Sequence, residues 1–135
     1  MKKKCFTLIE LMMVVVIIGV IASLAIPKFK KASSSARKKE ALRILKHIYN
    51  LEDAFYMEKG TYQISTGNNV IPDIGFIIPS STRRYNYTAI PGNTGDILTS
   101  LYIVATEIED ADIDGIYYEE IIIDENGIFH GDYEH

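Results

Sequence analysis

The sequence is poor in cysteine, since its 135 residues include only Cys5. One cysteine excludes an intramolecular disulfide, so no such bond can stabilise a small domain, and cysteine usage does not indicate a redox compartment. A lipid-modified cysteine follows an apolar segment, whereas the stretch ahead of Cys5 is Met-Lys-Lys-Lys. We therefore do not expect a lipoprotein signal.

Groups that could form a zinc site or a hydrolytic site are also scarce. The histidines are His47, His130 and His135, which are dispersed and have no cysteine beside them, so zinc is not expected. The serines at 33–35 have no base paired with them in the sequence. We expect no enzyme activity.

Charge is nearly absent from Phe6 to Ile26, where Glu10 is the one charged residue among 21. A helix of that length spans about 31 Å, which matches a bilayer core of about 30 Å. The segment is longer than the apolar core of a signal peptide and lacks its small-residue end, so we interpret it as a membrane anchor. The lysines at 2–4 favour a cytoplasmic start, although those at 28, 30 and 31 weaken this bias.

Glu10 lies inside this apolar segment, where a carboxylate costs about 2.5 to 3.5 kcal/mol on insertion scales and usually has a function. Cutting the chain between Cys5 and Phe6 would create an amine one helical turn from Glu10, in the same chain or a neighbouring one. The alternative is a carboxyl group that stays protonated or reaches the interface.

Charge of opposite sign is separated along the rest of the chain. Residues 28–46 carry eight basic residues against Glu40, whereas residues from His47 onward carry 16 acidic and three basic ones. A basic stretch beside a membrane segment favours a solvated or subunit-facing helix stripe. We expect no binding of nucleic acid.

A long helix is predicted over residues 6–59, because residues 28–59 contain neither proline nor glycine and Gly60 is a suitable stop. Its second half carries an apolar stripe suited to packing on a sheet: Ala41, Ile44, Ile48, Leu51 and Phe55. Such a helix extends about 80 Å, so its apolar first half should protrude and lie in a membrane or a filament core. Gly19 and Pro27 mark the expected bend, as a kink or as local melting.

The C-terminal half predicts a small antiparallel sheet. A connection rich in turn-forming residues covers 63–84, and the strand candidates are 85–90, 98–106, 117–124 and 128–130. Asn126-Gly127 predicts a tight turn between the last two strands. The fold class is therefore α+β, with a helix packed through its second half on a small sheet.

Asp110, Asp112 and Asp114 precede a glycine, in the manner of a calcium-binding loop. The twelfth position of that loop is Ile121 instead of glutamate, with Glu120 one place early. Both a calcium site and a solvated acidic turn are consistent with this pattern. We expect no other cofactor.

The stretch KKKCFTLIEL at 2–11, with Gly19 and Ala-Ile-Pro at 25–27, closely resembles the signature of type IV pilins and type II secretion pseudopilins. The resemblance implies that a prepilin peptidase cuts between Cys5 and Phe6 and methylates the Phe6 amine. It implies that Glu10 pairs with that amine of a neighbouring subunit, and that the helix can unwind between Gly19 and Pro27. The family usually has glycine at the position of Cys5. Residues 56–62 and 123–127 resemble pilin heads more weakly, and some pseudopilins bind calcium in an Asp-rich loop.

These interpretations divide the chain into a leader (1–5), a transmembrane and filament-core segment (6–27) and a head (28–135). The resemblance implies a structural subunit that polymerises with itself on an inner-membrane assembly platform, first as a membrane-bound precursor and then in an extracellular pilus. The alternatives are a pseudopilin of a periplasmic fibre, or an uncleaved single-span binding domain.

Overall fold

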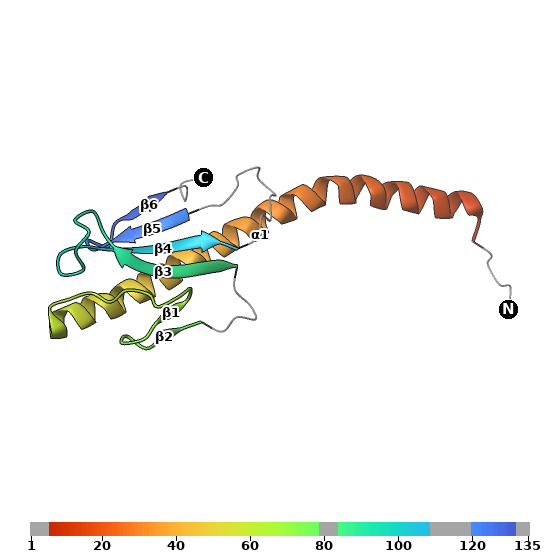
Figure 1. The fold of residues 1–135 in the computed structure, drawn as a ribbon. Coiled ribbons are helices and arrows are strands. Elements are labelled where there is room, and N and C mark those ends of the chain that lie inside the picture. Colours follow the sequence, from red (N-terminus) through yellow and green to blue (C-terminus); the bar gives the residue numbers. More distant parts are fainter. Residues whose placement is uncertain (1–5, 79–83, 109–119, 132–135) are drawn as a thin grey trace. The chain divides into compact units, whose positions relative to one another are not determined.

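The structure is a computed structural model that describes residues 6–78, 84–108 and 120–131 (Figure 1). The chain divides into two compact units, one up to Ser35 and one from Ala36 onward, and each is described by itself. Cys5 and the three aspartates at 110, 112 and 114 lie outside the described residues.

Helix α1 runs from Leu8 to Lys59 without interruption and confirms the predicted long helix. It ends as expected at Gly60, whose φ of 72° suits glycine and whose amide donates to the Tyr56 carbonyl at 2.8 Å. The helix continues through Gly19 and Pro27, and Ser23 Oγ donates to the Val20 carbonyl at 2.8 Å between them. Unwinding of this stretch stays a prediction.

The first unit exposes an apolar helix surface. From Phe6 to Ile26 every residue except the half-buried Ala22 is exposed. An 18-residue window of α1 has a mean hydropathy of 2.8 and no buried residue, so by length and composition the helix can cross a membrane. Surface of this kind is stable in lipid or against other apolar protein surface.

The second unit contains a four-stranded antiparallel sheet in the order β3-β4-β5-β6. The strands are β3 (Tyr85–Pro91), β4 (Leu101–Glu107), β5 (Glu120–Asp124) and β6 (Phe129–Gly131), which confirms the predicted α+β class. Strand β4 begins three residues later than expected, because Asp96 accepts hydrogen bonds from Leu98 and Ser100 in a preceding turn. The predicted connection at 63–84 also contains a hairpin of β1 (Val70–Ile71) and β2 (Phe76–Ile77).

The core forms where α1 packs on the sheet, but the predicted helix stripe needs correction. The buried helix positions are Ala41, Leu45, Ile48 and Glu52, while Ile44 and Leu51 pack only partly buried beside them. Phe55 is half-buried and lies outside this cluster. The buried positions follow one another at spacings of 4, 3 and 4 residues, and they form the stripe that faces the sheet. The apolar pattern of the sequence placed this stripe wrongly because its last member, Glu52, is not apolar.

The sheet contributes to the core through buried residues that pair with one another across neighbouring strands. Ile103 pairs with Ala89 on β3 and with Ile123 on β5, and all three are buried. Each faces the helix because side chains alternate along a strand.

Replacing Ile103 with alanine should lower the free energy of unfolding by about 2 to 5 kcal/mol, because it leaves a cavity in the core. Urea denaturation of the full chain in detergent, followed by tyrosine signals, measures this loss. Ile90→Ala is the control, since Ile90 is 43% exposed on neighbouring strand β3 and should change stability far less. Equal losses in the two variants would contradict the assigned packing.

Candidate assembly site at the start of the helix

Glu10 is held by Thr7 at the first turn of α1. Glu10 Oε2 accepts a hydrogen bond from the Thr7 amide at 2.8 Å and one from the Thr7 hydroxyl at 2.7 Å. In return, the Glu10 amide donates to Thr7 Oγ1 at 3.4 Å. These reciprocal bonds form a capping box, which satisfies amides that a helix start leaves without partners.

The capping box leaves part of the Glu10 carboxylate available to a further partner. Both bonds from Thr7 end on Oε2, and an ionised carboxylate offers about four acceptor positions. Glu10 is exposed, as is Phe6, whose side chain is 75% exposed. A cation from outside the subunit can therefore reach Glu10 while Thr7 holds it in place.

Two of the predicted sites involve residues outside the described part of the chain. Cleavage between Cys5 and Phe6 stays a prediction because Cys5 lies outside the described residues. The calcium site at residues 110–114 stays one for the same reason. Within the part of the chain that the structure describes, no three His, Cys, Asp or Glu side chains cluster as metal ligands.

Sequence reasoning missed Thr7. The signal was present, because Thr-x-x-Glu ahead of an apolar run is the sequence pattern of a capping box.

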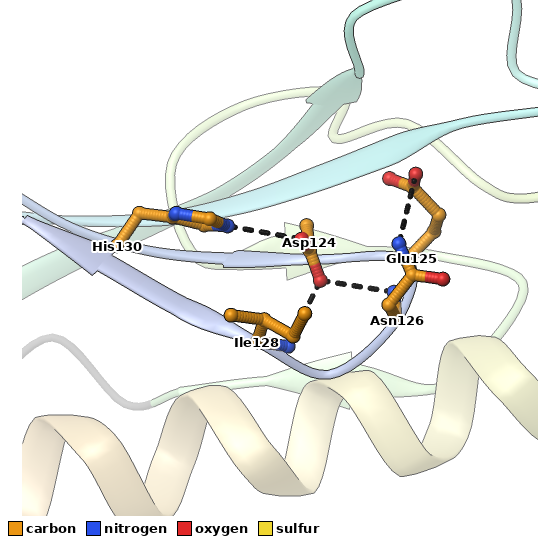
Figure 2. A network of polar contacts seen from close by, with 5 residues as sticks. All are labelled: Asp124, Glu125, Asn126, Ile128 and His130. Atoms are coloured by element: carbon orange, nitrogen blue, oxygen red, sulfur yellow. Dashed lines mark hydrogen bonds and ion pairs between the residues drawn. The ribbon is translucent and has the colours of Figure 1, made fainter.

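A second polar cluster closes the β5–β6 hairpin (Figure 2). Asp124 Oδ1 accepts from the amides of Asn126 at 2.9 Å and Ile128 at 2.8 Å, while Oδ2 lies 2.9 Å from His130 Nε2. Gly127 has a φ of 75° in this turn, which confirms the predicted Asn-Gly turn. Burial opposes ionisation of Asp124, but the bonds from His130, Ile128 and Asn126 outweigh it and hold the pKa of Asp124 below its usual value.

The sequence matches one family model and is similar to several known proteins. Residues 1–26 match the model of the prokaryotic N-terminal methylation motif. The chain is 40% identical over 86 residues to the type IV major pilin protein PilA of Myxococcus xanthus, covering 64% of this chain and 36% of that protein. It is 36% identical over 61 residues to type II secretion system core protein G of Escherichia coli, covering 45% and 42% of the two chains.

A third relative is a fimbrial protein of Neisseria meningitidis, 33% identical over 67 residues, or 50% of this chain and 38% of that protein. No solved structure matches. The chain thus spans less than half the length of each of these relatives.

The methylation motif, the long apolar helix and the small antiparallel sheet are together consistent with a pilin-like α+β fold. By these matches the chain is similar to type IV pilins and type II secretion pseudopilins.

Thr7→Ala should fray the start of α1, because an N-cap residue contributes about 0.5 to 2 kcal/mol. Hydrogen exchange at the Glu10 and Leu11 amides of the full chain in detergent measures the fraying, and we expect faster exchange. Thr7→Ser is the matched control, since it keeps the hydroxyl group. Unchanged exchange in the alanine variant would show that the capping box does not stabilise the helix start.

Acid should open the β5–β6 hairpin. Because the pKa of Asp124 is lowered by folding, its stabilising contribution is present above its ordinary pKa of 3.8 and is lost as the pH falls through the lower folded value. We expect protection of the Ile128 amide to fall in that range, and Asp124→Asn to remove this acid dependence. Glu125→Gln is the control, and a profile that Asp124→Asn leaves unchanged would refute the assignment.

Proposed function

We propose that this chain is a structural subunit of a type IV pilus-like filament and that it polymerises through the first half of α1. The observation that carries the proposal is the exposed apolar surface of residues 6–26, which contains one carboxylate, capped at the helix start. Lipid covers such a surface in a precursor, and neighbouring helices cover it in a fibre.

Processing supplies the cation that Glu10 requires. A prepilin peptidase cuts between Cys5 and Phe6 and methylates the new Phe6 amine, which stays positively charged. This amine then pairs with Glu10 of a neighbouring subunit on an inner-membrane assembly platform. Pairing offsets the cost of about 2.5 to 3.5 kcal/mol that a lone carboxylate carries inside an apolar layer. Docking of each new subunit is thereby directed to one position along the helix.

Location and role follow from this mechanism. The precursor resides in the inner membrane, and the assembled form is an extracellular pilus or a periplasmic pseudopilus. The head contributes surface to the fibre and no catalysis. The names of the relatives, a major pilin, a secretion core protein and a fimbrial protein, support a structural role.

A pseudopilin of a type II secretion system is the second candidate. The similarity to core protein G favours it, as does the acidic run at 110–114 as a candidate calcium loop. Abundant subunit in filaments sheared from the cell surface supports the pilin. An uncleaved single-span binding domain is the third candidate, and mass spectrometry showing residues 1–5 still attached would support it.

Glu10→Ala should leave membrane insertion intact and reduce the yield of sheared fibres at least about tenfold, the factor that corresponds to 1.4 kcal/mol per subunit contact. Immunoblots of membrane and fibre fractions measure both quantities. Glu10→Gln should behave in the same way, because the charge is what pairs with the amine. Ile9→Ala is the control that keeps Glu10. Normal fibre yield from Glu10→Ala would contradict the role of this carboxylate.

A further inference from the structure

The Glu52 side chain carries a carboxyl group that is buried at the core-facing side of α1. It lies on the core-facing stripe of α1, next along that stripe from Ile48, and both residues are 0% exposed. A charged side chain is almost never fully buried unless it is paired. The role proposed above for the start of α1 makes no use of this residue.

Only one of the two carboxyl oxygens of Glu52 has a hydrogen-bond partner among the described residues. Its Oε2 accepts a hydrogen bond from the Gln63 amide at 2.9 Å, whereas Oε1 has no hydrogen-bond partner among the described residues. A buried carboxylate needs more donors than this, but a neutral carboxylic acid with one accepted bond costs much less. Burial therefore raises the pKa of Glu52 to about 7, although the Gln63 hydrogen bond opposes the rise.

Among the described residues, burial and the Gln63 amide act on the Glu52 carboxyl group, and no cation compensates it. On α1, the positions three and four residues away are Ile48, Tyr49, Phe55 and Tyr56. The titratable groups that act on the neighbouring Tyr62 are Tyr56, Asp53, Glu125 and Tyr49, all acidic or neutral. Lys46 lies over the Tyr49 ring, and Lys59 pairs with Glu58 at the exposed end of the helix. The buried residues of strands β3 to β5 are apolar or tyrosine, apart from Asp124.

Gln63, which bonds to Glu52, belongs to a segment that covers the outer edge of strand β3. Residues 62–69, which we call the edge cover, bond to β3 along the side that β4 leaves free. The Ser65 amide donates to the Ala89 carbonyl at 3.0 Å, and Ser65 Oγ accepts from the Ala89 amide at 2.7 Å. Similarly, the Asn69 amide donates to the Tyr87 carbonyl at 2.7 Å, and Asn69 Oδ1 accepts from the Tyr87 amide at 2.9 Å. An uncovered edge strand is a template for pairing with another chain.

The Glu52–Gln63 bond is near the start of this cover. Beside it, the Tyr62 amide donates to the Ile97 carbonyl at 3.0 Å, and the Tyr62 ring stacks on Tyr56 with centroids 4.4 Å apart. The carboxyl group therefore connects the last turns of α1 to the chain that protects β3.

We propose that Glu52 is a proton-controlled latch, which in its neutral form holds the edge cover against β3 and on ionisation releases it. The proposal is independent of filament assembly, because it concerns residues of the second unit alone.

The direction of the pH effect follows from linkage. The folded pKa of about 7 lies above the ordinary value of 4.5, so the folded state binds the proton more tightly than the unfolded state. Stability from Glu52 is fully present below pH 4.5 and is lost as the pH rises towards 7. This is opposite to the dependence that Asp124 gives on the hairpin.

The test uses the full chain in non-ionic detergent. In the wild type, we expect protection of the Gln63 amide against hydrogen exchange, corrected for the intrinsic rate, to fall about tenfold or more between pH 5 and pH 8. Glu52→Gln should show no such fall, because the amide does not titrate. Asp53→Asn is the matched control, a neighbouring carboxyl outside the latch, and should behave as the wild type does.

A direct titration decides the matter if Glu52→Gln does not fold. Carbon-13 NMR of the Glu52 carboxyl group in the wild type should show a midpoint well above 4.5. A midpoint near 4.5, or parallel exchange profiles for the wild type and a folded Glu52→Gln protein, would overturn the latch. Fibre formation does not enter either measurement, so failure of the latch and failure of the proposed assembly function are distinguishable.

Discussion

The exposed apolar surface of residues 6–26 is the constraint on which the rest of the protein depends. Every side chain in this stretch except Ala22 is exposed, and surface of this composition is stable only in lipid or against other apolar surface. Helical structure satisfies the backbone here in either surrounding, because all its hydrogen bonds are internal to the segment. A helix is therefore suited both to a membrane and to the fibre that we propose, while unwinding between Gly19 and Pro27 stays a prediction.

The capping box refines the role of the carboxylate in this surface. Thr7 occupies Oε2 of Glu10 and keeps the side chain at the helix start, where the positive end of the helix dipole favours a negative charge. A pre-positioned carboxylate loses little side-chain entropy when a partner arrives. Thr7 is thus a positioning residue for the pairing that we propose.

The part of α1 that lies in the second unit, from Ala36 onward, packs on the sheet instead of exposing an apolar surface. Its core-facing stripe contains Leu45 and Ile48, as packing on a sheet requires, but it also includes Glu52. Replacing such a buried acid with an apolar residue is often neutral or stabilising in other proteins. Its presence here, bonded to the chain that covers β3, is consistent with control of that edge. Two of the carboxyl groups of α1 differ in chemistry, because Glu10 is exposed and bonded to Thr7 while Glu52 is buried with one donor.

Local patterns in the sequence by themselves determined the long helix, its stop at Gly60, the Asn126-Gly127 turn and the apolar segment around Glu10, because each depends on residues near one another in the chain. The capping partner Thr7 was equally local and could have been found. The tertiary structure alone decided that Leu45 and Glu52 face the core, that His130 reaches Asp124, and that residues 62–69 cover β3. Those outcomes depend on which face of the helix meets the sheet and on strand register, which bring together residues that no short sequence pattern connects.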